Sequence, residues 1–183
     1  MKQNLYDAGA FAAKIKNKNE LIKHLKDLHE DLHDRSQEMS DRPKGLKAVA
    51  QQLIQPKILK NSDKDVRLLT ACCLVDVLRI YAPEAPFNDA ETVGVFDALV
   101  SQLRGLSTYD SMSGISAKVL YILSSLSTVK SCVVPVILAQ SGVAGADETV
   151  ISLFDALLSE IRTEHSEDIM GHCYEIMQAC IEE

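Results

Sequence analysis

The most informative part of the sequence is KDVRLLTACCLVDVLRIY, residues 64–81. On a helical wheel at about 100° per residue, apolar side chains occupy most of the circumference, and Asp65, Asp76 and Arg79 share one narrow polar stripe. A helix that is apolar over so wide an arc packs against neighbours on more than one side. Arg67 falls within the apolar arc, so we expect an acidic or carbonyl partner for its guanidinium group. We therefore expect structural roles for Asp65 and Arg67.

The other apolar stretches repeat with helical rather than alternating spacing, and the chain has only 8 glycines and 5 prolines in 183 residues. This pattern predicts an all-α protein. Helices are predicted at 19–33, 43–59 with a kink at Pro56, 64–81, 90–106, 111–129, 131–140, 147–162 and 165–182.

Two of the predicted helices resemble each other in sequence. The blocks FDALVSQLR and FDALLSEIR begin at Phe96 and Phe154, which are 58 residues apart, and ETV precedes each of them. Paired-helix repeats have periods of about 40–47 residues, and an insertion at about 131–146 accounts for the excess. Chance similarity between amphipathic helices is the alternative. Together with the helix at 64–81, which is expected to pack on more than one side, the repeat predicts HEAT-like antiparallel helix pairs in a curved solenoid.

We expect one array over residues 1–183 rather than several domains. Its expected parts are a leading segment at about 1–18, a first helix pair at 19–60, a central region at 63–106 that includes the loop 82–87, and further pairs at 111–183.

Composition argues against several classes of protein. No stretch approaches the roughly 20 apolar residues of a membrane-spanning helix, and the N-terminus lacks the pattern of a secretory signal. The five cysteines include no CxxC pair, so we expect small buried apolar residues rather than zinc ligands or disulfides. The net charge of −7 disfavours nucleic acid as the main ligand, because phosphate binding needs an excess of lysine and arginine. A cytosolic or nuclear protein without membrane contact is expected.

A cluster of basic residues near the N-terminus suggests an alternative function. Lys14, Lys16 and Lys18 lie within residues 1–47, where 10 basic and 8 acidic residues give a net charge of +2. The three lysines are candidates for phosphate contact, so a HEAT scaffold that touches DNA or other subunits of an assembly through this segment is the alternative function. Three lysines beside a helix start are more often simply solvated, and direct DNA binding is not favoured.

Catalysis has little support in the sequence. His29 and His33 are four residues apart on a predicted helix, which is the spacing of a two-histidine metal pair, but nothing nearby completes a ligand set. The motifs of a phosphate-binding glycine loop or a nucleophile elbow are missing from the sequence. We predict no enzyme activity, no metal and no cofactor.

The loop APEAPF differs from the other connections. It consists of Ala82, Pro83, Glu84, Ala85, Pro86 and Phe87. Proline fixes φ and lacks an amide donor, so the loop is expected to be stiff and extended and to display its carbonyls and one carboxylate. A peptide could lay an aromatic side chain on the proline rings while its arginine pairs with Glu84. The loop is therefore a candidate peptide-binding site, and a connector that only ends a helix is the alternative.

Residues 63–87, DKDVRLLTACCLVDVLRIYAPEAPF, closely resemble a sequence near the N-terminus of one family. This is the cohesin-associated family "precocious dissociation of sisters" five, and residues 19–32, 100–106 and 127–131 resemble it too. The resemblance implies a non-enzymatic regulator of sister chromatid cohesion, built of HEAT repeats, that acts on the cohesin complex at chromosomes in the nucleus. Family members are much longer, so the chain resembles an N-terminal segment.

The resemblance also implies partners for the loop. In the family, the loop that corresponds to residues 82–86 binds short motifs containing tyrosine and arginine. These motifs belong to the releasing factor Wapl and its competitors, which include sororin in animals, and the cohesin acetyltransferase is a further partner. Glu84 stands where the family usually has Asp, which keeps the charge and lengthens the reach. The family binds the kleisin subunit of cohesin through a region beyond this segment, and its inositol-phosphate site has no matching basic cluster in residues 48–183.

Overall fold

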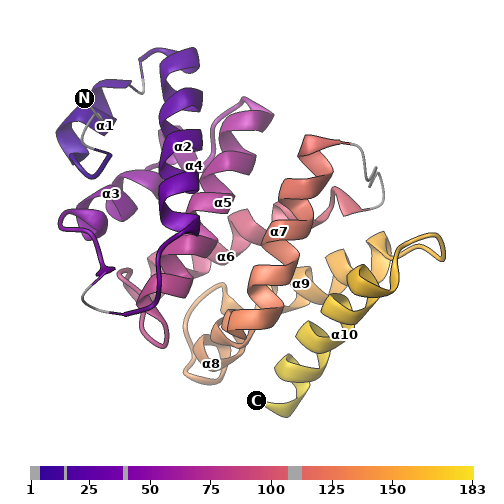
Figure 1. The fold of residues 1–183 in the computed structure, drawn as a ribbon. Coiled ribbons are helices and arrows are strands. Elements are labelled where there is room, and N and C mark those ends of the chain that lie inside the picture. Colours follow the sequence, from indigo (N-terminus) through magenta and orange to yellow (C-terminus); the bar gives the residue numbers. More distant parts are fainter. Residues whose placement is uncertain (1–4, 15, 39–40, 107–112) are drawn as a thin grey trace. The chain divides into compact units, whose positions relative to one another are not determined.

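A computed structural model describes residues 5–14, 16–38, 41–106 and 113–183 (Figure 1). Every regular element in these ranges is a helix, as the all-α prediction requires. The chain divides into two compact units, Met1–Phe87 and Asn88–Glu183, which are considered one at a time below. Among the described residues no single helix is long and apolar enough to span a membrane, although one pair bent by 82°, Gly114–Val129 with Ser131–Gln140, meets that test when its two helices are taken together.

Each unit consists of several helices (Figure 1). The first contains α1 (Ala8–Lys14), α2 (Lys18–His33), α3 (Leu46–Leu53), α4 (Pro56–Leu59) and α5 (Lys64–Tyr81). The second contains α6 (Asp89–Leu103), α7 (Gly114–Val129), the short 3-10 helix η3 (Ser131–Val133), α8 (Val134–Gln140), α9 (Ala146–Glu160) and α10 (Glu167–Glu182).

In the first unit α5 is the central helix, with 13 of its 18 residues buried. It packs against α2 as well as against α3 and α4, so the prediction of packing on more than one side is confirmed. Lys18 pairs with Asp63 where α2 and α5 begin, and Arg79 reaches the carbonyl of Leu32 where they end. The two helices therefore lie side by side and run in the same direction, and α1 packs against both α2 and α3.

In the second unit the two helices with similar sequences are neighbours. Thr149 Oγ1 on α9 donates to Asp97 Oδ1 on α6 over 2.6 Å, and Arg104 pairs with Asp155 over 2.8 Å. Because these contacts progress together along both helices, α6 and α9 run in the same direction. The helices α7 and α10 also run in the same direction, because Ser127 near the end of α7 contacts Glu175 and Cys132 just after it accepts from Cys180 near the end of α10. Equivalent helices that stack side by side are the arrangement of successive repeats in a helical array, and η3 with α8 occupies the predicted insertion.

The prediction of a single kinked helix at residues 43–59 is wrong. Gly45 has φ +91°, and a Cβ at that position would lie 2.4 Å from the Tyr6 carbonyl oxygen, so α3 begins only after this glycine. At its far end α3 stops before Pro56, because the residue before a proline disfavours helical geometry and Gln55 is extended with ψ 138°. Pro56 instead occupies the first turn of the separate helix α4.

The short helix α1 was not predicted from the sequence. Its sequence AGAFAAK has one large apolar residue, Phe11, which is fully buried and lies with its ring 4.9 Å from the ring of His24. A seven-residue segment with only one large apolar residue has no repeating apolar pattern, so the sequence gives no sign of this helix. Side chains cap the starts of two longer helices, since Asp63 accepts hydrogen bonds from the first amides of α5 and Asn88 forms a capping box with Glu91 at α6.

Candidate functional site

The loop 82–87 leaves α5 at Ala82, whose backbone is no longer helical, with ψ 139°. Exposure varies along the loop. Pro83 and Glu84 are exposed, Ala82, Ala85 and Phe87 are half-buried, and Pro86 is buried. Among the described residues none donates a hydrogen bond or forms an ion pair with the Glu84 carboxylate. The loop therefore presents one carboxylate and one proline ring to solvent, whereas the sequence suggested two rings.

Hydrogen bonds hold the loop backbone at both ends. The amide of Glu84 donates to the Tyr81 carbonyl over 3.1 Å, which closes a turn directly after α5. At the other end Gln51 Nε2, on α3, donates to the Pro86 carbonyl over 3.1 Å. Because both ends are tied, the exposed carboxylate projects from a backbone that has already lost much of its conformational freedom.

Side chains from the connection between α2 and α3 satisfy the last carbonyls of α5, which have no partner within the helix. Arg42 Nη2 donates to the Ile80 carbonyl over 3.0 Å, and its guanidinium group lies 4.0 Å from the centre of the Tyr81 ring. Gln37 Nε2 donates to the Arg79 carbonyl over 3.1 Å. This end of α5, from which the loop continues, is therefore fixed by residues distant in sequence.

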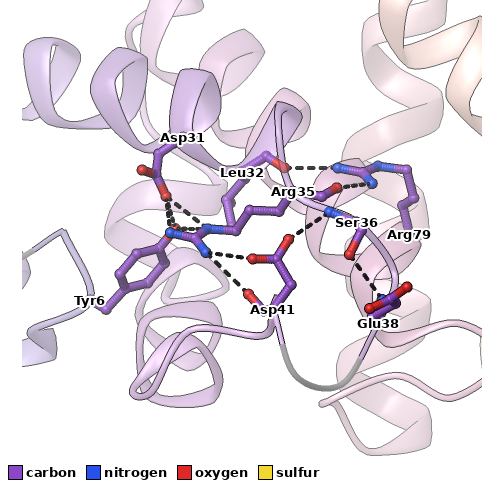
Figure 2. A network of polar contacts seen from close by, with 8 residues as sticks. All are labelled: Tyr6, Asp31, Leu32, Arg35, Ser36, Glu38, Asp41 and Arg79. Atoms are coloured by element: carbon purple, nitrogen blue, oxygen red, sulfur yellow. Dashed lines mark hydrogen bonds and ion pairs between the residues drawn. The ribbon is translucent and has the colours of Figure 1, made fainter.

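Arg79 makes the reciprocal connection from α5 to the end of α2. Its Nη1 and Nη2 donate to the carbonyls of Arg35 and Leu32 over 2.7 and 2.8 Å, as Figure 2 shows. Arg35 in turn lies between Asp31 and Asp41 and donates to both carboxylates. The network thus joins the end of α2, the connection that follows it and the end of α5.

Tyr6 ties the segment before α1 into this network (Figure 2). Its hydroxyl donates to Asp31 Oδ2 over 2.5 Å and accepts from Arg35 Nε over 3.2 Å. Burial, followed by the hydrogen bond to Asp31, raises the pKa of Tyr6 well above its ordinary value. The phenol therefore stays protonated at neutral pH and acts as a donor.

Two of the three residues in the polar stripe of α5, Asp76 and Arg79, face α2. Asp76 is fully buried, with Oδ2 lying 2.7 Å from His29 Nδ1 and Oδ1 3.7 Å from Arg79 Nη2. Asp65 is exposed in the first turn of α5. Arg67 Nη1 donates to the Asn61 carbonyl over 2.5 Å, a partner of the kind expected for a guanidinium group in the apolar arc.

Two of the three candidate phosphate-binding lysines have partners inside the first unit. Lys18 forms an ion pair with Asp63, which raises the pKa of the lysine, and Lys14 Nζ lies 3.1 Å from His24 Nδ1. Lys16 is exposed. A phosphate contact by this segment would have to compete with these existing contacts of Lys14 and Lys18.

Metal and thiol chemistry have little support in the described residues. The rings of His29 and His33 are 6.1 Å apart, but His29 is bonded to Asp76. No group of three or more potential metal ligands occurs in the ranges described. All five cysteines are buried, as predicted. Burial raises the pKa of Cys173 to about 11, so this thiol is not an activated nucleophile.

Sequence reasoning missed the residues that support the loop. Gln37, Arg42 and Gln51 lie 30 or more positions from the carbonyls they bind. Each is a single polar residue in a polar connection or on the outer side of a helix. No motif or periodicity in the sequence distinguishes such a residue from a solvated one.

Comparison with known proteins identifies the family of the chain and supports its fold. The family model described as "Sister chromatid cohesion protein PDS5 protein" matches residues 19–183. PDS5 homolog A of Gallus gallus is 34% identical over 171 residues, 93% of this chain and 12% of that protein. PDS5 of Saccharomyces cerevisiae is 38% identical over 115 residues, 63% of this chain and 9% of that protein.

A solved structure has a similar fold. A chain in the structure of the Pds5–Scc1 complex is 28% identical, with a TM-score of 0.76, and the match covers 90% of this chain and 23% of that chain. The prediction of HEAT-like helix-pair repeats is confirmed by this similarity. The chain spans only 9–12% of the length of these curated relatives.

Proposed function

Because the chain belongs to the PDS5 family of sister chromatid cohesion proteins, we propose that it is a non-enzymatic binding platform in the regulation of cohesin. Its site of action would be the chromosomes in the nucleus, where sister chromatids are held together. Residues 1–183 would contribute one continuous array of helix pairs. The kleisin subunit of cohesin would be bound by a region outside these residues.

The loop 82–87 is the proposed binding site for a short linear motif. Its ligands would be the tyrosine- and arginine-containing motifs of a Wapl-type releasing factor, a sororin-like competitor and the cohesin acetyltransferase. The observation that carries this proposal is the exposed Glu84 carboxylate on a backbone held at both ends. An arginine of the motif would form a charge-assisted hydrogen bond with this carboxylate.

The ring of Pro83 would receive the aromatic side chain of the motif. Pro86 is buried, so its role would be to hold the end of the loop, where Gln51 donates to its carbonyl. A loop that is ordered before binding loses little conformational entropy when the motif docks. The small size of the surface suggests micromolar affinity, with further strength from other contacts in the assembly.

A single loop of six residues has room for one such motif at a time. A releasing factor and its competitor would therefore exclude each other, and the ratio of their concentrations would decide which one occupies cohesin-bound protein. Release of the cohesin ring and its acetylation would then depend on which partner is available to bind the exposed carboxylate of Glu84.

Calorimetry with a synthetic peptide of the Wapl-type tyrosine and arginine motif tests the proposal. Glu84→Lys should weaken binding at least tenfold, because it replaces attraction of the peptide arginine by repulsion, and Glu84→Asp should retain binding. Glu30→Lys is the matched control, since Glu30 is an equally charged, exposed residue on α2. All three variants should unfold at nearly the wild-type temperature. Equal affinity of Glu84→Lys and wild type would overturn the proposal.

A further inference from the structure

Positive charge in this acidic protein is concentrated in one short segment of the first unit. Residues 42–62 contain five basic residues and no acidic one, whereas the chain as a whole has a net charge of −7. Four of the five are lysines, at positions 44, 47, 57 and 60, and all four side chains are exposed. A local group of cations of this kind marks where phosphate groups can bind a protein, even when its net charge is negative.

The fold brings these lysines together on the exposed sides of α3 and α4. Both helices pack on α5 and contact each other, and only two residues separate them in the chain. Their inner sides are formed by the buried residues Leu46, Val49, Ala50, Leu53 and Ile58. Lys47, Lys57 and Lys60 lie outside these positions, and Lys44 is in the turn that leads into α3. The four lysines therefore form one patch, which is called the lysine surface below.

Neighbouring carboxylates do not neutralise the lysine surface. None of its four lysines forms an ion pair with a described residue. The acidic residues that flank the segment in sequence are already bonded, Asp41 to Arg35 and Asp63 to Lys18. Lys14 and Lys18, in contrast, have partners within the first unit. The structure therefore moves the candidate phosphate contact from residues 14–18 to α3 and α4.

The lysine surface has no large apolar side chain. All seven large apolar side chains that are exposed among the described residues lie in the second unit. The exposed residues between the lysines are small or uncharged, namely Gly45, Ala48, Gln55 and Pro56. Interfaces between proteins depend on buried aromatic or aliphatic anchors and are depleted in lysine. A surface that offers cations without such an anchor suits a ligand that binds through its charge.

From these observations we infer that α3 and α4 form a contact surface for the phosphodiester backbone of nucleic acid. The four ammonium groups would pair with phosphate oxygens. The eight-residue helix α3 is about 12 Å long, which corresponds to about three or four phosphates of one strand. Such contacts do not read base edges, so binding would be independent of sequence. The surface belongs to internal helices of the array and includes no residue of the loop 82–87.

The chemistry of the surface disfavours other anionic partners. An acidic protein segment would gain only exposed ion pairs, which contribute little by themselves. An anionic membrane holds a helix that inserts an apolar face beside its lysines, and the exposed sides of α3 and α4 have no such face. Nucleic acid has closely spaced phosphates and releases condensed counterions when lysines bind them. It therefore needs no apolar contact.

Fluorescence anisotropy of a labelled DNA duplex of about 20 base pairs, titrated with the complete chain, tests the inference. We expect micromolar binding at about 50 mM salt and equal binding of a duplex of unrelated sequence. Four phosphate contacts predict that the logarithm of the association constant falls with the logarithm of the salt concentration with a slope of about −3.6. This slope corresponds to a loss of about a hundredfold between about 50 and 200 mM salt. A slope near zero would overturn the inference.

Paired substitutions that change the charge equally separate the lysine surface from the net charge of the chain. Lys57→Gln with Lys60→Gln should weaken duplex binding about tenfold and make the salt slope shallower by about 2. Lys23→Gln with Lys26→Gln is the matched control, because both lysines are exposed on α2, and it should leave binding nearly unchanged. Circular dichroism should show unchanged helicity in both variants, since all four side chains are exposed. Equal loss of binding in the two variants would overturn the assignment.

A third pair tests whether α3 and α4 act as one surface. Lys44→Gln with Lys47→Gln should weaken duplex binding as much as the α4 pair does, and unchanged affinity would overturn the assignment. Binding of a decaglutamate peptide, or of vesicles containing phosphatidylserine, as tightly as the duplex would also overturn it, because the partner would then be an acidic protein or a membrane. The Wapl-type peptide should bind Lys57→Gln with Lys60→Gln as it binds the wild type, so this test is independent of the loop 82–87.

Discussion

The seam between α2 and α5 in the first unit and the seam between α7 and α10 in the second are built from different chemistry. The first encloses Asp76, which is fully buried and bonded to His29, with Arg79 reaching three carbonyls at the end of α2. The second is centred on apolar residues such as Cys173 and Ile176, and its polar contact between Ser127 and Glu175 lies at the margin. Both seams join parallel, equivalent helices of neighbouring repeats.

The difference shows what fixes the register of the paired helices, which is their relative position along the helix axis, in each unit. Apolar packing is non-directional, so the seam of the second unit tolerates small shifts along the helix axis. A buried carboxylate is stable only when its partners are correctly placed, so the seam of the first unit permits one register. That register positions the end of α5, and with it the loop 82–87.

The largest expected effect is in the charged seam. Asp76→Ala would leave His29 and Arg79 facing a buried site without a carboxylate, and breaking a buried pair in this way costs about 3–5 kcal/mol. Urea unfolding followed by circular dichroism measures this loss. Glu30→Ala, which removes an exposed carboxylate from α2, should change stability by less than about 0.5 kcal/mol. Similar values for the two variants would contradict the special role of the charged seam.

An intermediate effect is expected from acid. Burial, and then the charge of Lys14, lowers the pKa of His24 to about 4. Below pH 6.5 the unfolded chain binds a proton that the folded chain does not, so the free energy of unfolding should fall by about 2–3 kcal/mol between pH 6.5 and pH 4. Denaturation at a series of pH values measures this slope. The His24→Leu variant should lack that part of the slope, and an unchanged slope would contradict the assignment.

The smallest effect is expected in the second unit. The side chain of Glu175 is 63% exposed, and its hydrogen bond from Ser127 lies at the edge of the seam. Glu175→Gln should leave the stability of the chain nearly unchanged, because an exposed polar contact contributes little. Thermal unfolding of the variant measures it. A loss as large as that of Asp76→Ala would show that the two seams are equally dependent on charge.

Much of the helical architecture could be predicted from the sequence. The helix at 64–81 was predicted with its observed bounds, because the periodicity of apolar residues is a local property. The errors occurred at Gly45, where the Tyr6 carbonyl approaches, and at α1, which has a single apolar anchor. Both depend on contacts between segments that are far apart in sequence.

The candidate site could also be predicted only in part. The residues of the loop 82–87 were predicted because two prolines around one carboxylate are visible in the sequence, and the local chemistry of proline makes such a segment stiff. Which side chains are exposed could not be predicted, and Pro86 is buried whereas Glu84 is open. Burial depends on neighbours that fold back from elsewhere in the chain.

Most helix positions, the repeated FDAL segment and the family resemblance were all present in the linear order of residues, because each depends on side chains a few positions apart. The partners of Asp76, the carbonyls that Arg79 binds, and the side chains that bind the carbonyls of Ile80 and Pro86 could be identified only in the folded structure, where distant segments pack together. Hydrogen bonds and burial depend on distance in space, and spacing along the chain does not specify that distance.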